Sequence, residues 1–192
     1  MSISVPLAPK RRRGHLRVAA ILQAAEELFA EKGYDAATMT EIAARSKTAI
    51  GSLYRFFPNK EVLADALLTD YVERVVESLD AIAGEAAGMT PRQLAEALVA
   101  YRLRLKAHRK VAFVLLDAGS GLAEKRGELG AQLRERLVAA LCRAFSPLDE
   151  GRARTMARVT QHMLKLVSEA PAEEDAVVAD VTDLLESYFT RR

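Results

Sequence analysis

Two short helix patterns, separated by a four-residue break, lie between residues 38 and 57. The first begins at a capping box, because the Thr38 hydroxyl can accept from the backbone N–H of Glu41 while the Glu41 carboxylate accepts from that of Thr38. The second covers residues 49–57 and is ended by Pro58, whose ring cannot continue a helix. With the helix expected before it as a brace, this pair predicts a helix-turn-helix, a motif whose second helix enters the major groove of DNA.

Helical periodicity also covers most of the remaining chain. Apolar residues three and four apart form one stripe along residues 17–32, and Gly33 stands where a helix C-cap is expected. A second stripe runs over residues 62–82, and Pro91 is well placed to open the next helix. Further helices are expected at about 110–118, 128–145, 149–168 and 173–190. Helix-forming residues dominate the composition, so the sequence predicts an all-α fold of about nine helices.

Charge divides the chain into a basic front and a mildly acidic body. Residues 1–60 hold ten Lys or Arg against five Asp or Glu, whereas the rest holds 18 against 21. This asymmetry indicates a module that faces a polyanion, although a basic tail can also be only a solvated arm. We expect a flexible basic arm (1–13), a three-helix helix-turn-helix domain (14–60) and a helical ligand-binding and dimerisation domain (61–192). The arm either lies along phosphates or a minor groove, or is a disordered solubilising tail.

Several classes of function find no support in the sequence. Cys142 is the only cysteine, so no internal disulfide can form and a reducing, cytoplasmic setting is expected. No apolar run reaches the roughly 18 residues that span a bilayer, so we expect no membrane partner. The three histidines are far apart, and catalytic and nucleotide-binding motifs are missing, so we expect no metal, no cofactor and no enzymatic activity. A helical enzyme with a buried pocket and a helical interaction module remain the alternatives.

The second short helix separates its side chains by chemistry. Leu53, Phe56 and Phe57 can pack inward, which leaves the opposite face free for DNA. Gly51 would let the backbone approach DNA closely, and Arg55 can contact phosphate or the O6/N7 edge of guanine. The expected DNA-binding residues are Thr38, Thr40, Arg45, Thr48, Ala49, Ile50, Gly51, Ser52, Tyr54, Arg55 and Lys60.

The helical body gives weaker signals. Some of its aromatic, apolar and hydroxyl side chains could line a pocket between helices, although such residues are more often simply core. The candidate ligand-binding residues are Tyr71, Tyr101, Leu105, Phe113, Leu116, Met156, Thr160 and Met163. Their mixture favours a small, moderately apolar molecule. The last two expected helices are long and amphipathic, so they are the candidates for a dimer interface, unless they pack only within one subunit.

Residues 17–64 resemble the amino-terminal signature of the tetracycline-repressor (TetR/AcrR) family. The likeness rests on Leu28-Phe-Ala-Glu-Lys-Gly-Tyr34, on Thr38-Met-Thr-Glu-Ile-Ala-Ala44 and on Gly51-Ser-Leu-Tyr-Arg-Phe-Phe-Pro-Asn-Lys-Glu-Val-Leu63. The resemblance implies a homodimer with a four-helix interface that binds a palindromic operator in double-stranded DNA. It also implies a repressor that a small-molecule effector releases from that operator.

The turn between the two short helices departs from the family pattern. The family usually has Ala-Gly-Val-Ser there, whereas this chain has Ser46-Lys47-Thr48-Ala49. If Lys47 takes the left-handed conformation of the glycine it replaces, its side chain costs on the order of 1 kcal/mol. Ala49 replaces a capping hydroxyl, which Thr48 could supply from the neighbouring position. Phe56 stands where a histidine is common. These changes affect the turn and single DNA contacts rather than the fold.

Overall fold

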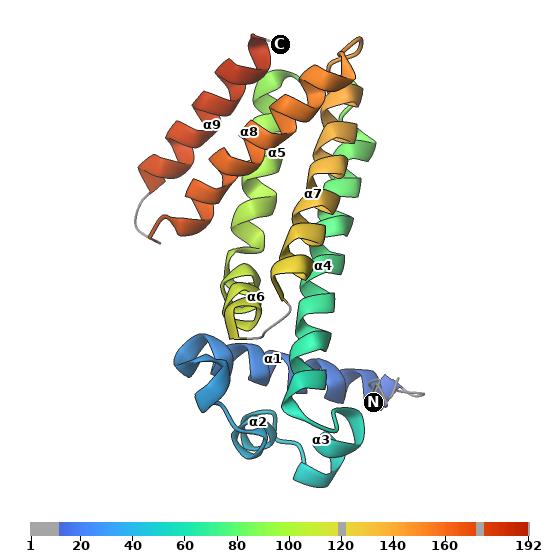
Figure 1. Ribbon diagram of the computed structural model, residues 1–192, viewed down its shortest axis with the longest axis vertical. Helices are drawn as coiled ribbons and strands as arrows, with labels where there is room; N and C mark the ends of the chain where they lie inside the picture. The colour runs from blue at the N-terminus through green and yellow to red at the C-terminus, as the bar shows by residue number, and fades with distance from the viewer. Residues whose placement is uncertain (1–11, 119–121, 172–174, 192) are drawn as a thin grey trace. The chain divides into compact units, whose positions relative to one another are not determined.

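The computed structural model describes residues 12–118, 122–171 and 175–191, without the side chains of residues 113, 116–118 and 122–126. These residues form α-helices and no strand (Figure 1), which confirms the expected all-α class. The helices are α1 (Arg12–Ala36), α2 (Met39–Arg45), α3 (Ile50–Phe56), α4 (Lys60–Glu85), α5 (Pro91–Arg104), α6 (Lys106–Ala118), α7 (Leu122–Ala144), α8 (Glu150–Glu169) and α9 (Asp175–Thr190).

The chain divides into two compact units, which differ from the ranges expected from the sequence. Unit 1 comprises Met1–Tyr71 and His108–Ala123, and unit 2 comprises Val72–Ala107 and Glu124–Arg192. Unit 1 therefore continues eleven residues past the expected boundary at residue 60 and takes in most of α6. The physical reason is burial, because Val111 and Leu115 of α6 belong to the same apolar core as α1 to α3.

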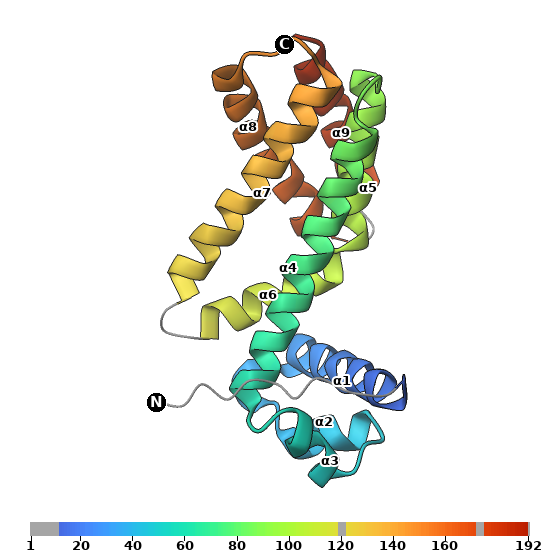
Figure 2. The ribbon, with the colours of Figure 1, turned by 90° about the vertical axis from the view of Figure 1, so that its right-hand side faces the viewer.

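The first helix is longer than expected at both ends. It begins at Arg12, so two residues assigned to the flexible arm are helical, whereas the rest of the arm lies outside the described residues. Gly33, with φ 82°, interrupts the helix at the predicted C-cap position, and the chain then turns one more time before α2. Figure 2 shows α1 above the pair α2 and α3. Its buried face supplies the large core residues Ile21, Leu28 and Phe29.

The capping box predicted at the start of α2 is present. The backbone N–H of Glu41 donates to Thr38 Oγ1 over 3.3 Å, and the N–H of Thr38 donates to Glu41 Oε2 over 3.0 Å. Lys32 of α1 also forms an ion pair with Glu41, so the same carboxylate joins two helices. The hydrogen bonds from Lys32 and Thr38 lower the pKa of Glu41 from 4.5 to about 2.

In unit 2, α5 packs against both α8 and α9 (Figure 1). Thr90 and Gln93 form a second capping box at the start of α5, which the sequence reading missed although both residues fit the pattern. Arg92 forms ion pairs with Asp183 and Glu186 of α9. The side chain of Arg102 is buried, and its Nε donates to the backbone oxygen of Leu164 in α8 over 3.1 Å.

The shifted pKa of Glu41 makes part of the stability depend on pH. The folded value, about 2, lies below the unfolded value of 4.5, so the charged carboxylate favours folding above about pH 4.5, and this contribution is lost as the pH falls towards 2. Glu41→Gln keeps the capping box but loses the ion pair with Lys32. We expect this variant to show a smaller fall in melting temperature than the wild type between pH about 5 and about 2.

Glu61→Gln is the matched control, because Glu61 also lies in the first turn of a helix and has no ion pair or hydrogen bond among the described residues. Equal pH dependence of the wild type and the Glu41→Gln variant would contradict the assignment.

Candidate nucleic-acid interface

The turn between α2 and α3 is tight and partly strained. The N–H groups of Ser46, Lys47 and Thr48 donate to the carbonyls of Ile42, Ala44 and Ala43 over 2.9, 3.1 and 2.9 Å. Lys47 has φ 51°, which is the left-handed conformation expected for the residue that replaces a glycine. The expectation for Thr48 was wrong: its hydroxyl donates back to the Ser46 carbonyl over 3.3 Å, and Ala49 is the N-cap of α3 without a side-chain bond.

Helix α3 has one buried and one open face, as its sequence indicates. Leu53, Phe56 and Phe57 are buried in the core of unit 1. Ile50 and Tyr54 keep 42% and 47% of their surface exposed. The packing of the inner face therefore fixes the orientation in which the outer face is presented.

The open face of α3 offers several kinds of contact to a ligand. A Cβ added to Gly51 would meet no atom within 4 Å, so the backbone there is open to close approach. The side chain of Arg55 is exposed and lies over the Phe56 ring, with its guanidinium carbon 5.1 Å from the ring centroid. Ser52 is half-buried, and the exposed Tyr54 hydroxyl has no hydrogen-bond partner among the described residues. These groups can donate to phosphate or to base edges.

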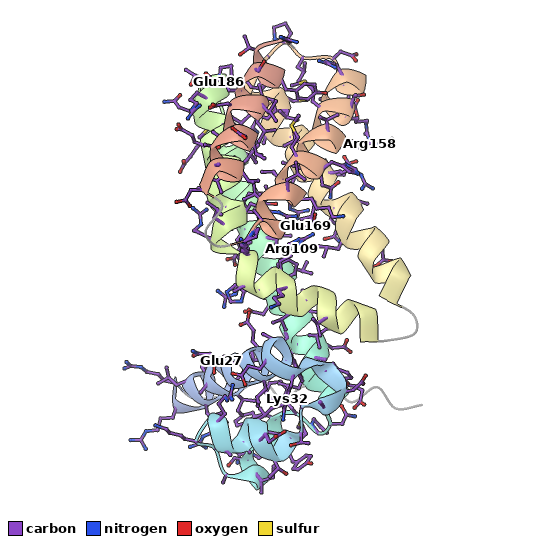
Figure 3. All side chains as sticks on the ribbon, turned by 90° about the vertical axis from the view of Figure 1, so that its left-hand side faces the viewer. Glu27, Lys32, Arg109, Arg158, Glu169 and Glu186 are labelled. Atoms are coloured by element: carbon purple, nitrogen blue, oxygen red, sulfur yellow. The ribbon has the colours of Figure 1, made fainter. Side chains whose placement is uncertain are left out.

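Arg45, an expected DNA contact, is engaged within the protein. Its Nη2 donates to Glu31 Oε2 over 2.8 Å, and its Nη1 lies 3.9 Å from Glu27 Oε2. The hydrogen bond from Arg45 holds the pKa of Glu31 below its usual value. Figure 3 shows Glu27 and Lys32 on α1, the helix that supplies both acidic partners of Arg45. Most of the charge of Arg45 is therefore compensated by α1.

Lys60, the expected phosphate donor at the start of α4, is also engaged within unit 1. Its ammonium donates to the backbone oxygens of Tyr34, Asp35 and Ala37 over 2.9, 3.1 and 3.1 Å. It also lies 4.4 Å from the centroid of the Tyr34 ring. An ammonium has three donors, and all three are used here. The end of α1 and the connection to α2 are thus fastened to the start of α4.

The other residues expected to contact DNA differ in whether their side chains are engaged within the protein. The Thr38 hydroxyl is part of the capping box and also donates to Glu41 Oε2 over 2.7 Å, whereas Thr40 is exposed. The sequence reading missed Lys47, which is exposed and has no ion-pair partner among the described residues. Its signal was present, because a cation in the turn next to α3 lies beside the expected DNA-binding face.

The candidate ligand-binding residues do not gather in one described hollow. Tyr71 lines a hollow of about 10 Å³ in unit 1, which is the size of a single water site. A more open hollow of about 460 Å³ between α4 and α5 in unit 2 contains none of the candidates. In unit 2, Tyr101, Leu105, Met156 and Thr160 are buried and Met163 is half-buried. Phe113 and Leu116 lie outside the described side chains.

Two kinds of feature are absent from the described ranges. No group of His, Cys, Asp and Glu side chains there is arranged to hold a metal ion. No helix there is long and apolar enough to cross a membrane.

The left-handed Lys47 generates a prediction about stability. Lys47→Gly should raise the free energy of unfolding by on the order of 1 kcal/mol, because glycine adopts positive φ without a steric cost. Urea denaturation measures the effect. Lys47→Ala is the matched control, since it removes the same charge but keeps the Cβ. Equal stabilisation by both substitutions would show that charge, and not strain, is the cause.

The helix-turn-helix segment is similar to segments of known proteins. A sequence model described as bacterial regulatory proteins, tetR family, matches residues 21–67. An HTH-type transcriptional repressor of Mycobacterium tuberculosis is 52% identical over 50 residues, which cover 26% of this chain and 27% of that repressor. The chain thus matches about a quarter of the length of this relative.

Solved structures extend the likeness to most of the chain. A TetR-like transcriptional regulator from Rhodococcus sp. RHA1 is 27% identical with a TM-score of 0.65, and the match covers 91% of this chain and 94% of that chain. The complex of SmeT with triclosan has a TM-score of 0.69 at 21% identity, covers 91% of this chain and 90% of that chain, and supports the fold alone. Residues 21–67 are therefore similar to the tetR family of bacterial regulatory proteins, and the fold of most of the chain is similar to that of a TetR-like transcriptional regulator.

Proposed function

We propose that the chain is a DNA-binding transcriptional repressor that binds a palindromic operator as a homodimer and is released by a small molecule. The observation that carries this proposal is the divided surface of α3, where Leu53 and Phe56 are buried while Ile50, Tyr54 and Arg55 point outward. Such a helix, presented by a helix-turn-helix, fits the major groove of B-DNA. The name of the Mycobacterium tuberculosis relative, a transcriptional repressor, supports the same function.

The contacts of the proposed complex follow from which groups are free. Ile50 can meet a thymine methyl, Arg55 a guanine edge or phosphate, and Tyr54 a phosphate oxygen. Arg45 and Lys60 contribute by holding α1, α2 and α4 in place, because Arg45 is paired with Glu31 and the three donors of Lys60 are used inside the unit. In this proposal they position the reading helix and do not themselves hold phosphate.

Helices α8 and α9 supply the proposed dimer interface. Apart from its buried stripe, each of these helices carries a second row of apolar side chains at helical spacing: Val159, Met163 and Leu166 on α8, and Val177, Leu184 and Tyr188 on α9. Leu166 and Leu184 are 51% and 53% exposed. A two-fold axis that brings both rows of one subunit against those of another would bury them in a four-helix interface.

The effector site of this proposal lies in unit 2. Thr160 is fully buried on α8, and its hydroxyl has no hydrogen-bond partner among the described residues. Leaving such a group unpaired costs about 1–3 kcal/mol, so a ligand that hydrogen-bonds to it would gain affinity. SmeT, a protein of similar fold, forms a complex with triclosan. Release from DNA then requires that the effector bind the DNA-incompetent state more tightly.

Tyr54 tests the DNA-binding face. Duplexes selected from a random pool by the full chain serve as probe in a gel shift. Tyr54→Ala should weaken binding about tenfold or more, since a hydrogen bond to a charged phosphate contributes about 1.5–3 kcal/mol. Tyr54→Phe separates the hydroxyl from the ring. Leu103→Ala on α5, a change at another exposed site, is the control. Unchanged affinity of the Tyr54→Ala variant would refute the assigned face.

Leu184 tests the dimer interface. Leu184→Glu should raise the dimer dissociation constant on the order of 100-fold or more, because the interface would bury unpaired carboxylates. Size-exclusion chromatography with light scattering reports the mass. Leu103→Glu is the matched control, because Leu103 is also an exposed leucine of unit 2 but lies on α5. A wild type that is monomeric, or a Leu184→Glu variant that stays as dimeric as the control, would contradict this interface.

A further inference from the structure

The first turns of α1 carry three arginines that the fold does not use. Arg12, Arg13 and Arg17 are exposed, and none of them has an ion pair or a hydrogen bond among the described residues. They differ in this from Lys32, Arg45 and Lys60 of the same unit, which are held by Glu41, by Glu31 and by three carbonyls. The positive charge at the start of α1 is therefore uncompensated within the described chain.

The first residues of α1 are also held by little packing. No residue between Arg12 and Ala20 is buried, and the first buried side chain of α1 is Ile21. Leu16 lies in the middle of the stretch and is 63% exposed. Val18 is half-buried and packs against the core of unit 1. The helix thus continues for about 9 Å, at 1.5 Å per residue, beyond the part that this core holds.

The order of charges along α1 opposes the helix dipole. Cations stand at its amino end, where acidic residues are favoured, and its first turn has no acidic residue while its last turn has no basic one. At the acidic end, the charge of Glu31 is compensated by Arg45. The basic end has no such partner. A run of cations that is unfavourable for the isolated helix is typical of a surface that binds a polyanion.

Helical register places Arg13 and Arg17 on the side of α1 that faces α2. Arg13 precedes Glu31 by 18 residues, which is about five turns and about 27 Å along the axis, so the two side chains point in the same direction. Arg17 lies one turn further along on the same face. Glu31 is bonded to Arg45 at the end of α2, which fixes this direction within unit 1. In Figure 2 the first turns of α1 lie at the edge of unit 1, beside α2 and α3.

We propose that Arg13 and Arg17, with Arg12 beside them, bind the phosphate backbone of the DNA duplex that flanks the site read by α3. This inference rests on the proposed function, because it adds a second contact to the same duplex. We expect these arginines to contact phosphates and not base edges. Three arginines within two helical turns form a row of positive charge, and nothing fixes their guanidinium groups in the orientation that a base contact needs. Each protomer thereby extends the operator footprint outward.

The test uses the full chain and a duplex selected from a random pool by the wild type. The Arg13→Ala/Arg17→Ala double variant should reduce the slope of log Kd against log salt by about 1.8 for each protomer, because each lost phosphate contact removes about 0.9. At 0.15 M salt this corresponds to an affinity loss on the order of 30-fold per protomer, if the affinity at 1 M salt is unchanged. Hydroxyl-radical footprints should lose their outer flanks and keep their centre.

A matched control removes two other exposed cations. Arg104→Ala/Lys110→Ala changes the net charge equally and should keep the wild-type footprint and most of the slope. Thermal melting of both double variants should stay near the wild type, since the substituted side chains are exposed and have no partners. A wild-type footprint for the Arg13→Ala/Arg17→Ala variant, or an equal loss of slope in the control, would overturn the inference.

Two outcomes separate this inference from the proposed function. If the wild type selects no duplex at all, the proposed function fails. If it selects a duplex but the Arg13→Ala/Arg17→Ala variant loses only binding to anionic lipid vesicles, the function stands and the inference about DNA is overturned.

Discussion

Burial of the inner faces of α2 and α3 is the constraint on which the proposed interface depends. Each of these helices has seven residues, and helices of that length are not stable in water by themselves. Their stability comes from the packing of Ile42, Leu53 and Phe56 into the core that α1 and α4 complete. Because this core admits only one orientation of α3, the same packing that stabilises the short helices also decides which side chains face outward.

The cations of unit 1 fall into two groups. Some are bound to carboxylates or carbonyl oxygens within the unit, and the others have no such partner among the described residues. Lys60 fastens the α1–α2 connection to α4, and Arg45 fastens α2 to α1. The positive charges of Lys60 and Arg45 are therefore bound to groups within unit 1. The charges left over, on Lys47, Arg55 and the first turns of α1, lie at the surface of the unit. A polyanion would therefore meet a set of cations that differs from the one that sequence position alone suggests.

Unit 2 shows how one pair of helices can carry two apolar faces. Leu164 and Val167 of α8, like Leu185 and Phe189 of α9, are buried within the subunit. Leu166 and Leu184 are largely exposed on the same helices. Periodicity alone does not assign adjacent apolar positions, such as Leu184 and Leu185, to one face or the other. The proposed dimer gives this second face a partner.

Local features of this protein were determined by the sequence itself. The capping box of Thr38 and Glu41, the stop at Pro58 and the inward set of Leu53, Phe56 and Phe57 depend on residues close together in the chain, so spacing was enough to predict them. Tertiary structure decided the partners of Lys60 and Arg45. Lys60 binds carbonyls at least 23 residues before it in the chain, and Arg45 binds carboxylates at least 14 residues before it. It also decided the membership of α6 in unit 1, because Val111 and Leu115 fill a core built by helices far away in the chain. A side chain's free or engaged state depends on what the fold brings beside it, and no local pattern contains that information.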